Sequence, residues 1–264
     1  MKEIYVEGAS LPESYHNALV ALNTFGEISN CSDWDCTQKE ISVTMVVKEP
    51  LAEPRISKLC ICTPESLEQY RQEMLDGILD FCIGHGWDYT YHNRMVNYDA
   101  DKHGMLNQVE FVINELKRNP ESRRAVIDVR DNRVDPFGED PSCLQHCQFF
   151  IRNGKLDEYI LFRSNDACKA TFMNAFALIE LQRCIANALG VGVGTYVHRA
   201  NSFHAYERDY EDLANYCRHI EKDPIEKLTY KYVDGWDKKM EKAKPAIETK
   251  IKNLKDVKLG DSNG

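Results

Sequence analysis

One segment, residues 141–206, constrains the fold of this 264-residue chain more than any other. Its centre is an Asn153-Gly154 pair between two strand-like runs, and Asn-Gly is the strongest short-range signal for a β-hairpin. The run Phe172–Leu189 is apolar on most sides, which predicts a helix buried at the centre of a domain. Another strand is expected over Val193–Ala200. A hairpin, a central helix and a further strand indicate an α/β domain.

The rest of the chain alternates between strand and helix patterns without an internal repeat. The β-branched run Ile41–Val47 and the apolar run Ala125–Val129 both predict strands. Residues 29–40 are expected to form a polar loop, and residues 86–95 an irregular aromatic segment. Helices are predicted where apolar residues recur at i, i+3 and i+4, over residues 11–25, from Thr63-Pro64-Glu65 onward, and over 105–116 and 206–220.

Composition sets the domain count and limits the kinds of partner. A single domain is expected over residues 1–240, followed by a charged, partly disordered tail over 241–264, where Lys and Glu dominate. The net charge of −9 argues against a general nucleic-acid or anionic-membrane surface. The N-terminus has no apolar signal sequence and no run is long enough to span a bilayer, so a cytoplasmic protein is expected. None of the ten cysteines stands at CxxC spacing, so we expect no structural zinc site and mostly buried, apolar thiols.

Cys143 is the first candidate for chemistry, because it follows Pro141-Ser142 in a turn just before the predicted hairpin. Arg163 ends the second strand of the same hairpin. An arginine near a thiol lowers the pKa of that thiol and favours the thiolate, which is the nucleophilic form. An inert buried thiol is the alternative, and these residues alone leave both possibilities open.

Several motifs then follow one another in the order and spacing of one enzyme family. They are NPESRR at 119–124, PSC at 141–143, the Asn-Gly hairpin, RSND at 163–166, Asn174 in the next helix and HAY at 204–206. With these motifs the chain resembles thymidylate synthase and its relatives, the pyrimidine nucleotide hydroxymethylases. The match runs from about Tyr91 to Tyr206, and the short form is closest to the archaeal and phage-like branches.

The resemblance implies a three-layer α/β fold with a mixed β-sheet, packed sheet to sheet in a homodimer. It implies one-carbon transfer from 5,10-methylene-tetrahydrofolate, or a related methylene-pterin, to C5 of a pyrimidine nucleoside monophosphate. Conversion of dUMP to dTMP is the first hypothesis. Hydroxymethylation of dUMP, dCMP or CMP is the second, and a non-catalytic nucleotide-binding homologue is the third.

By the same resemblance, Cys143 is the thiolate that adds to C6 of the ring, and Asn174 bonds the ring O4 and N3. An amide can match O4 and N3–H, so Asn174 favours uracil. Arginines suit a phosphate dianion because their guanidinium groups bond it bidentately. The remaining substrate-binding residues implied are Arg163 and Ser164 for the phosphate, Arg123 and Arg124 for the phosphate of the neighbouring subunit, and His204 and Tyr206 for the sugar 3′-hydroxyl.

The resemblance also implies roles on the cofactor side, each with a structural alternative. Glu73 would act in proton transfer, or lie on a helix surface. Tyr91 would join the proton network, or pack in the core. Asp166 would lie near the ring and the cofactor, or cap a turn. Trp87 would lie beside the folate, or be a core tryptophan.

The chain departs from the family pattern mostly on this side. Leu144 stands where the usual enzyme has histidine, and Phe162 where it has glutamine. The span from Glu73 to Tyr91 is short, and neither the N-terminal Arg-Thr-Gly loop nor the apolar C-terminus of the family is present. Methylation and hydroxymethylation, and folate and modified pterin, therefore stay open at this point.

Overall fold

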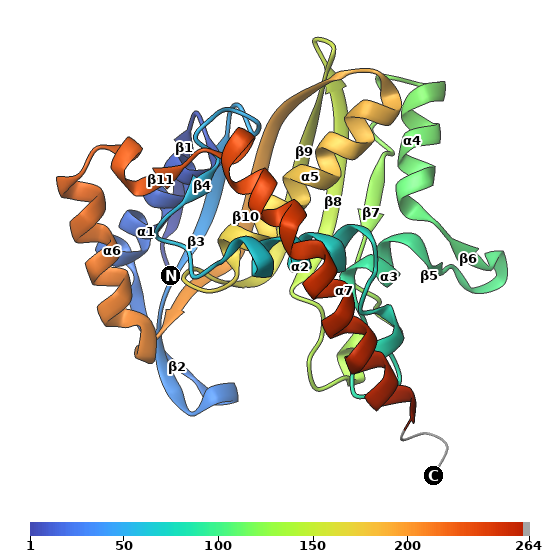
Figure 1. Ribbon diagram of the computed structural model, residues 1–264, viewed down its shortest axis with the longest axis horizontal. Coiled ribbons are helices and arrows are strands. Elements are labelled where there is room, and N and C mark those ends of the chain that lie inside the picture. The colour runs from blue at the N-terminus through green and yellow to red at the C-terminus, as the bar shows by residue number, and fades with distance from the viewer. Residues whose placement is uncertain (261–264) are drawn as a thin grey trace.

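The computed structural model describes residues 1–260 and is built on a mixed seven-stranded sheet (Figure 1). The strand order is β1-β3-β10-β9-β8-β7, with β2 paired to the start of β3. The β1/β3 and β9/β10 pairs are parallel and the others antiparallel. The strands are β1 (Glu3–Gly8), β2 (Glu27–Cys31), β3 (Cys36–Val47), β7 (Val126–Asp128), β8 (Leu144–Arg152), β9 (Lys155–Asp166) and β10 (Gly192–Tyr206). Two further two-stranded sheets pair β4 (Ile56–Ser57) with β11 (Thr229–Tyr230) and β5 (Tyr98–Asp99) with β6 (Met105–Leu106).

Helices form the layers on one side of this sheet. Helix α5 packs against β9 and β10, α1 against β1 and β3, and α4 against β7. Farther from the sheet, α6 packs on α1, α2 packs on α5, and α7 packs on α2 (Figure 1). The helices are α1 (Leu11–Phe25), α2 (Pro64–Leu75), α3 (Tyr91–Val96), α4 (Gln108–Arg118), α5 (Thr171–Leu189), α6 (Tyr210–Lys222) and α7 (Asp237–Gly260). The predicted mixed α/β architecture is confirmed.

The predicted hairpin and central helix are both present. Asn153 and Gly154 join β8 to β9, and both have positive φ, which suits the Asn-Gly turn. Along β9 the side chains of Leu156, Glu158, Ile160 and Phe162 are buried, and the alternate residues are half-buried or exposed. One face of β9 therefore belongs to the core and the other faces outward.

Two segments that were predicted to lack regular secondary structure contain strands or a helix. Residues 29–40 form most of the β2/β3 hairpin, whose pairs include Ser29 with Gln38 and Cys31 with Cys36. The prediction of a loop was wrong because these strands are half-exposed, so polar side chains hide the apolar alternation. Residues 86–95 include the start of α3, where the Thr90 hydroxyl accepts a hydrogen bond from the backbone N–H of Asn93 and caps the helix.

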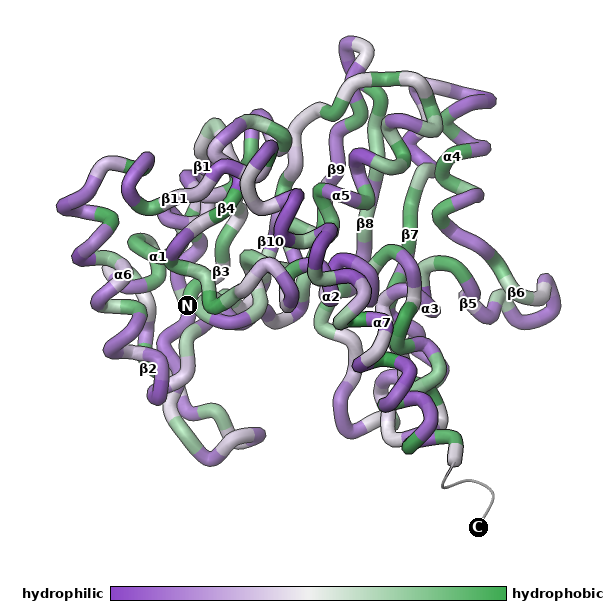
Figure 2. Tube along the Cα trace, viewed as in Figure 1, coloured by the Kyte–Doolittle hydropathy of each residue, from purple (hydrophilic) through white to green (hydrophobic). Residues whose placement is uncertain are grey.

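The C-terminal prediction also needs correction. Up to Gly260 the charged tail is part of helix α7, which packs along α2. Met240 and Ile247 are buried two turns apart on one face, whereas hydrophilic residues dominate the rest of the helix (Figure 2). The prediction was wrong because so narrow an apolar stripe within a Lys- and Glu-rich sequence gives the pattern expected of a solvated, disordered segment. Residues 261–264 of the predicted tail lie outside the described residues.

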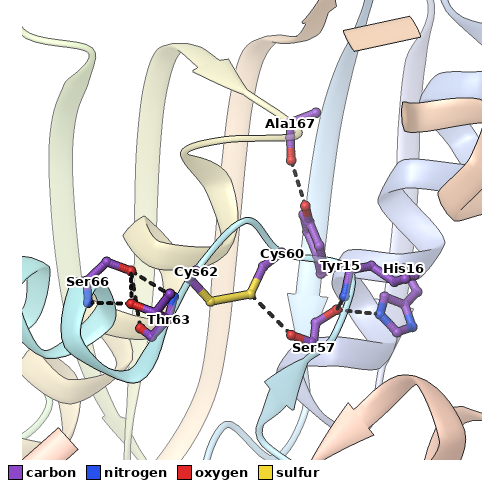
Figure 3. The surroundings of a disulfide bond; sticks show 9 residues. Tyr15, His16, Ser57, Cys60, Cys62, Thr63, Ser66 and Ala167 are labelled. Carbon is purple, nitrogen blue, oxygen red and sulfur yellow. Dashed lines mark hydrogen bonds between the residues drawn. A yellow bond between two sulfur atoms is a disulfide. The ribbon is translucent and has the colours of Figure 1, made fainter. Parts of the chain in front are cut away.

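The cysteines differ in burial and in bonding. The free thiols buried in the core are Cys82, Cys147, Cys168 and Cys217, as predicted. Cys31, Cys36 and Cys143 are half-buried and Cys184 is exposed, so the expectation of mostly buried thiols was wrong for these four. Cys60 and Cys62, between β4 and α2, form a disulfide (Figure 3). Nearby, the Tyr15 hydroxyl donates to the carbonyl of Ala167 at 2.9 Å and ties α1 to the loop after β9. Among the helices built from residues 1–260, none is both long and apolar enough to cross a membrane.

Candidate active site

Cys143 lies in a tight turn that leads into β8, and Arg163 at the end of β9 holds that turn. The Arg163 guanidinium donates from Nε to the Ser142 carbonyl at 3.1 Å and from Nη2 to the Pro141 carbonyl at 2.6 Å. The Arg163 backbone N–H donates to the Cys143 carbonyl at 2.9 Å. The sequence therefore places thiol and guanidinium together by pairing the start of β8 with the end of β9.

The Cys143 side chain is half-buried, and its charge state reflects opposing influences. Burial raises the pKa of the thiol, the Arg163 guanidinium lowers it, and the Asp140 carboxylate raises it further. Burial is the largest of these causes, so the pKa stays above its ordinary value. The expectation that Arg163 favours the thiolate is right in direction, but the desolvation of the thiol outweighs it.

A cavity of about 1190 Å³ opens beside this turn. Its walls include Tyr70 and Glu73 of α2, Tyr91 of α3, Trp87 and Pro141. The Tyr91 hydroxyl accepts a hydrogen bond from the backbone N–H of Leu144 at 3.3 Å. Burial raises the pKa of both Tyr70 and Tyr91. The neutral phenols thus surround the space next to Cys143.

Glu73 faces this cavity and is held by two other side chains. Gln69, one turn earlier on α2, donates from Nε2 to a Glu73 carboxylate oxygen at 2.7 Å. Lys250 of α7 donates to the Gln69 carbonyl oxygen at 2.7 Å. Burial raises the pKa of Glu73, and the Gln69 hydrogen bond and the Lys250 charge oppose that shift. The alternative of a surface glutamate is therefore not what the structure shows.

Asn174 of α5 is buried with its amide bonded at both ends. Its Oδ1 accepts a hydrogen bond from Asn165 Nδ2 at 2.9 Å, and its Nδ2 donates to the Tyr70 hydroxyl. The Tyr70 side chain lines the cavity, so the Nδ2 end of the amide is directed to that side. Asp166, by contrast, accepts the backbone N–H groups of Cys168 and Lys169 at 2.9 Å each, which is the turn-capping geometry.

His204 and Tyr206 lie side by side at the end of β10. Their ring centroids are 4.8 Å apart, as their spacing along a strand predicts. His204 is buried, and its Nε2 has no hydrogen-bond partner among residues 1–260. Ser164 pairs with Ser202 across β9 and β10, and the Ser202 hydroxyl lies 3.3 Å from His204 Nδ1. A buried imidazole nitrogen without a partner is available to a ligand hydroxyl.

The structure does not bring Arg123 and Arg124 into this cluster within one chain. Both are exposed in the loop before β7. Arg123 accepts a hydrogen bond from Gln148 through its carbonyl, and the Arg124 backbone N–H donates to Ser122. The Arg123 and Arg124 side chains therefore do not lie beside Cys143 of the same chain, as Arg163 does.

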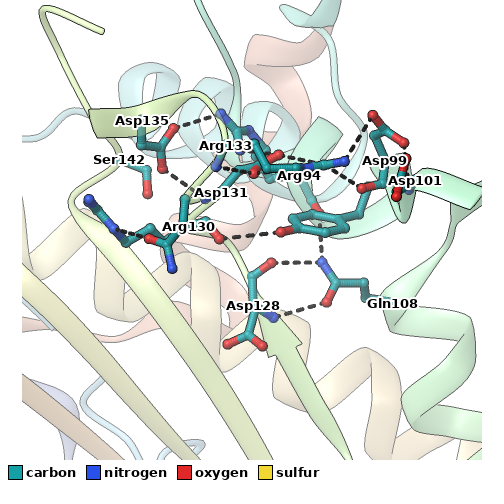
Figure 4. Close-up of polar contacts among 12 residues, drawn as sticks. Arg94, Asp99, Asp101, Gln108, Asp128, Arg130, Asp131, Arg133, Asp135 and Ser142 are labelled. Carbon is teal, nitrogen blue, oxygen red and sulfur yellow. Dashed lines mark hydrogen bonds and ion pairs between the residues drawn. The ribbon is translucent and has the colours of Figure 1, made fainter. Parts of the chain in front are cut away.

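A network of ion pairs supports the loop that leads to Pro141 (Figure 4). Arg94 of α3, almost fully buried, donates to the Asp135 carboxylate at 2.7 Å. The other Asp135 oxygen accepts the backbone N–H of Asp131 at 2.9 Å, and Arg133 pairs with the Asp131 carboxylate at 2.8 Å. These contacts hold the loop that leads to the cysteine turn against α3.

Several side chains at the site are assigned no role from the sequence. They are Tyr70, Tyr89, Arg94, Asn165, Gln69 and Lys250. Tyr70 precedes Glu73 by three residues on the predicted helix, so their shared face is a signal that helical spacing provides. The others depend on contacts between distant parts of the chain.

The turn that carries the Cys143 thiol is braced by the Arg163 guanidinium, and its Pro141 lines the same cavity as the Glu73 carboxyl. This arrangement is typical of enzymes that use a cysteine nucleophile. Residues 66–256 match the family described as Thymidylate synthase, so the chain belongs to the thymidylate synthase family, a class of methyltransferases. That family binds dUMP-type nucleotides, uses methylene-tetrahydrofolate and is typically dimeric.

Similar proteins agree with this assignment. A Methanocaldococcus jannaschii protein, provisionally named a thymidylate synthase, is 34% identical over 80% of this chain and 95% of its own length. Thymidylate synthase 1 of Bacillus spizizenii is 29% identical over 55% of this chain and 49% of its own. The solved thermostable thymidylate synthase A of Bacillus subtilis shares the fold, with a TM-score of 0.63 and 18% identity over 79% of this chain and 84% of its own.

Proposed function

We propose that this protein transfers a one-carbon unit from 5,10-methylene-tetrahydrofolate, or a related methylene-pterin, to C5 of dUMP, giving dTMP. The observation that carries the proposal is the Cys143 turn, which Arg163 braces and whose Pro141 lines the same cavity as Glu73. That cavity is large enough for a nucleotide and a second ligand, and the nucleophile and the phosphate-binding cation would lie at its edge.

The Cys143 thiolate would add to C6 of the uracil ring and form a C–S bond, which turns C5 into the nucleophilic carbon of an enolate. The negative charge then develops on O4, where the Asn174 Nδ2 group supplies a fixed donor. Glu73, with a pKa raised by burial, is suited to hold and release a proton next to the ring. Tyr91 and Asp166 would complete the polar surroundings of the ring.

The nucleotide would lie along the ends of β9 and β10. Arg163 and Ser164 would bind the phosphate, and the unpartnered Nε2 of His204 would bond the sugar 3′-hydroxyl beside Tyr206. Arg163 spends two of its N–H groups on carbonyls of the cysteine turn, which leaves others for a phosphate oxygen. Phosphate binding would therefore also order the nucleophile.

The residues on the outer part of the cavity fit a flat pterin ring. Trp87 is 43% exposed and Phe137 85% exposed, and both line the cavity. When bound there, the methylene-pterin would supply both the one-carbon unit, at the oxidation level of formaldehyde, and the hydride that reduces it to a methyl group, and would itself be oxidised to the dihydropterin. The aromatic walls would orient it and exclude water from its inner face.

We further propose a homodimer that packs through the open face of the sheet, where the exposed Tyr159 and the half-buried Leu161 and Val197 lie. In that arrangement Arg123 and Arg124 would reach the phosphate in the neighbouring subunit. Their exposure, and their separation from the Cys143 cluster in one chain, support this assignment.

The test is covalent trapping. With 5-fluoro-dUMP and methylene-tetrahydrofolate, mass spectrometry should find an adduct on Cys143, and Cys143→Ser should abolish it. Cys184→Ser, at an exposed cysteine of α5, is the matched control and should leave the adduct intact. With dUMP itself, tritium release from C5 reports turnover, and the product mass separates methyl from hydroxymethyl. Absence of any adduct with a folded protein would favour a nucleotide-binding homologue without catalysis.

A further inference from the structure

A chain of buried hydrogen bonds runs through the core from β10 to the cavity wall. The Tyr196 hydroxyl lies 3.0 Å from His198 Nδ1, and His198 Nε2 lies 2.9 Å from Asn165 Oδ1. Asn165 Nδ2 then meets Asn174 Oδ1 at 2.9 Å, and Asn174 Nδ2 meets the Tyr70 hydroxyl. The first and last members are far apart in the sequence, and only Tyr70 borders the cavity.

Such a chain of hydroxyl, imidazole and amides can be bonded in either of two directions. In one, each group donates from Tyr196 toward Tyr70; in the other, every amide is turned over and each group donates the opposite way. The direction decides which atom of the Asn174 amide is presented on the Tyr70 side. It therefore decides whether that side offers the base an N–H donor or a carbonyl acceptor.

The far end of the chain settles the direction. Tyr196 is fully buried, and among residues 1–260 its hydroxyl has no hydrogen-bond partner other than His198. The nearby Glu158 carboxyl oxygens accept no hydrogen bond from it. Only donation to His198 Nδ1 satisfies the Tyr196 O–H, because a buried hydroxyl hydrogen without an acceptor costs about 1–3 kcal/mol.

His198 passes this direction on. Complete burial lowers the pKa of His198 to about 3, so the imidazole is neutral and carries a single N–H. With Nδ1 accepting from Tyr196, that N–H is on Nε2 and donates to Asn165 Oδ1. The Thr171 hydroxyl lies 2.8 Å from the same oxygen and 2.9 Å from the Asp166 carbonyl, so its one hydrogen is compatible with this direction without deciding it. Asn165 Nδ2 is then left to donate to Asn174 Oδ1.

We propose that Tyr196, His198 and Asn165 are positioning residues that fix the Asn174 amide with its N–H end toward the base, and so restrict the site to uracil. The inference rests on the proposed function. Tyr70, which borders the cavity, passes the choice on, because its oxygen accepts from Asn174 and its own hydrogen is therefore available to a ligand. The O4 atom of uracil accepts that hydrogen, whereas the 4-amino group of cytosine sets donor against donor.

The direct test reverses the Asn174 end of the chain with Asn165→Asp. A carboxylate only accepts, so it takes the hydrogens of His198 Nε2 and Asn174 Nδ2, and the Asn174 amide turns its carbonyl toward Tyr70. By calorimetry, wild type should bind dUMP about 10- to 100-fold tighter than dCMP, and the variant should lose or invert that preference. Asn187→Asp, an exposed change at the far end of α5, should keep the wild-type ratio.

Tyr196→Phe provides a second, isosteric variant that adds no buried charge, and should reduce the dUMP preference about 3- to 10-fold. The His198 tautomer, read from ¹⁵N chemical shifts in the ligand-free wild type, should be Nε2–H. An Nδ1–H tautomer overturns the inference, as does an unchanged dUMP preference in both variants. Wild type that binds neither nucleotide instead overturns the proposed function, and the inference with it.

Discussion

The carboxyl group of Glu158 lies in the core on the helix-facing side of β9, and its removal should stabilise the protein. The residue is 0% exposed, and neither carboxyl oxygen has a hydrogen-bond partner within residues 1–260. Its neighbours include Cys147 and Tyr196, which are also fully buried. Burial raises the pKa of Glu158 well above its ordinary value, so the folded protein holds the carboxyl as a neutral acid.

The sign of the pH effect follows from that raised pKa. Below about pH 4 the carboxyl is protonated in both the folded and the unfolded chain, and it contributes no pH dependence. As the pH rises, the unfolded chain releases this proton before the folded chain does. The free energy of unfolding should therefore fall through the range between the unfolded and the folded pKa of Glu158.

Substitution by leucine removes both the ionisation and the unsatisfied oxygens. An unsatisfied buried polar group costs about 1–3 kcal/mol, and that is the minimum gain expected for Glu158→Leu at neutral pH. An unfolding entropy of about 2.1 cal/mol/K per residue gives roughly 0.55 kcal/mol/K for 264 residues. The expected rise in Tm is therefore about 2–5 °C.

Differential scanning calorimetry between about pH 4 and pH 8 measures both effects. Glu158→Leu should raise Tm at neutral pH and flatten its pH dependence, and Glu158→Gln should flatten the dependence with a smaller gain. Glu110→Gln, at an exposed position of α4, is the matched control and should change neither. A lower Tm for Glu158→Leu at neutral pH, or an undiminished pH slope, would refute the reasoning.

Two further predictions concern the active site. Gln69→Leu and Lys250→Met each remove a group that lowers the pKa of Glu73, so the acid limb of the pH–activity profile should move to higher pH, followed by tritium release from C5. Lys252→Met, exposed on the same helix, should not move it, and a shift to lower pH for either variant contradicts the assignment. Mixing Arg124→Glu with Cys143→Ser subunits should restore about one quarter of wild-type activity, because half of the dimers are hybrids with one intact site. A hybrid that stays inactive while both parents are folded rules out a phosphate site shared between subunits.

Features with a local physical cause could be predicted from the sequence. The Asn153-Gly154 turn, the helix that follows Thr63-Pro64 and the apolar helix Phe172–Leu189 each carry their signal within a few residues, and each is present. The pairing of Cys143 with Arg163 follows from the motifs, because the two residues end neighbouring strands of one hairpin. Local signals thus place the proposed nucleophile and the arginine beside it.

Features that depend on the environment of a side chain could not be predicted in the same way. Burial raises the pKa of Cys143 more than the Arg163 charge lowers it, and the size of the burial effect depends on how many atoms surround the sulfur. The contact of Asn174 with Tyr70 joins residues 104 positions apart. Helix α7 gains its stability from packing on α2, and a sequence rich in Lys and Glu does not display that partner.

Glu158 and Tyr196 are neighbours in the core, so the charge of Glu158 also affects the hydrogen bonds that set the base specificity. An ionised Glu158 would be a stronger acceptor than a neutral imidazole nitrogen, and could draw the Tyr196 O–H away from His198. Burial keeps Glu158 neutral, so His198 Nδ1 stays the acceptor, and the amides of Asn165 and Asn174 keep their orientation. On this argument the unpartnered acid is compatible with base selection only because it is uncharged. Glu158→Leu should therefore raise Tm and leave both the His198 tautomer and the preference for dUMP unchanged.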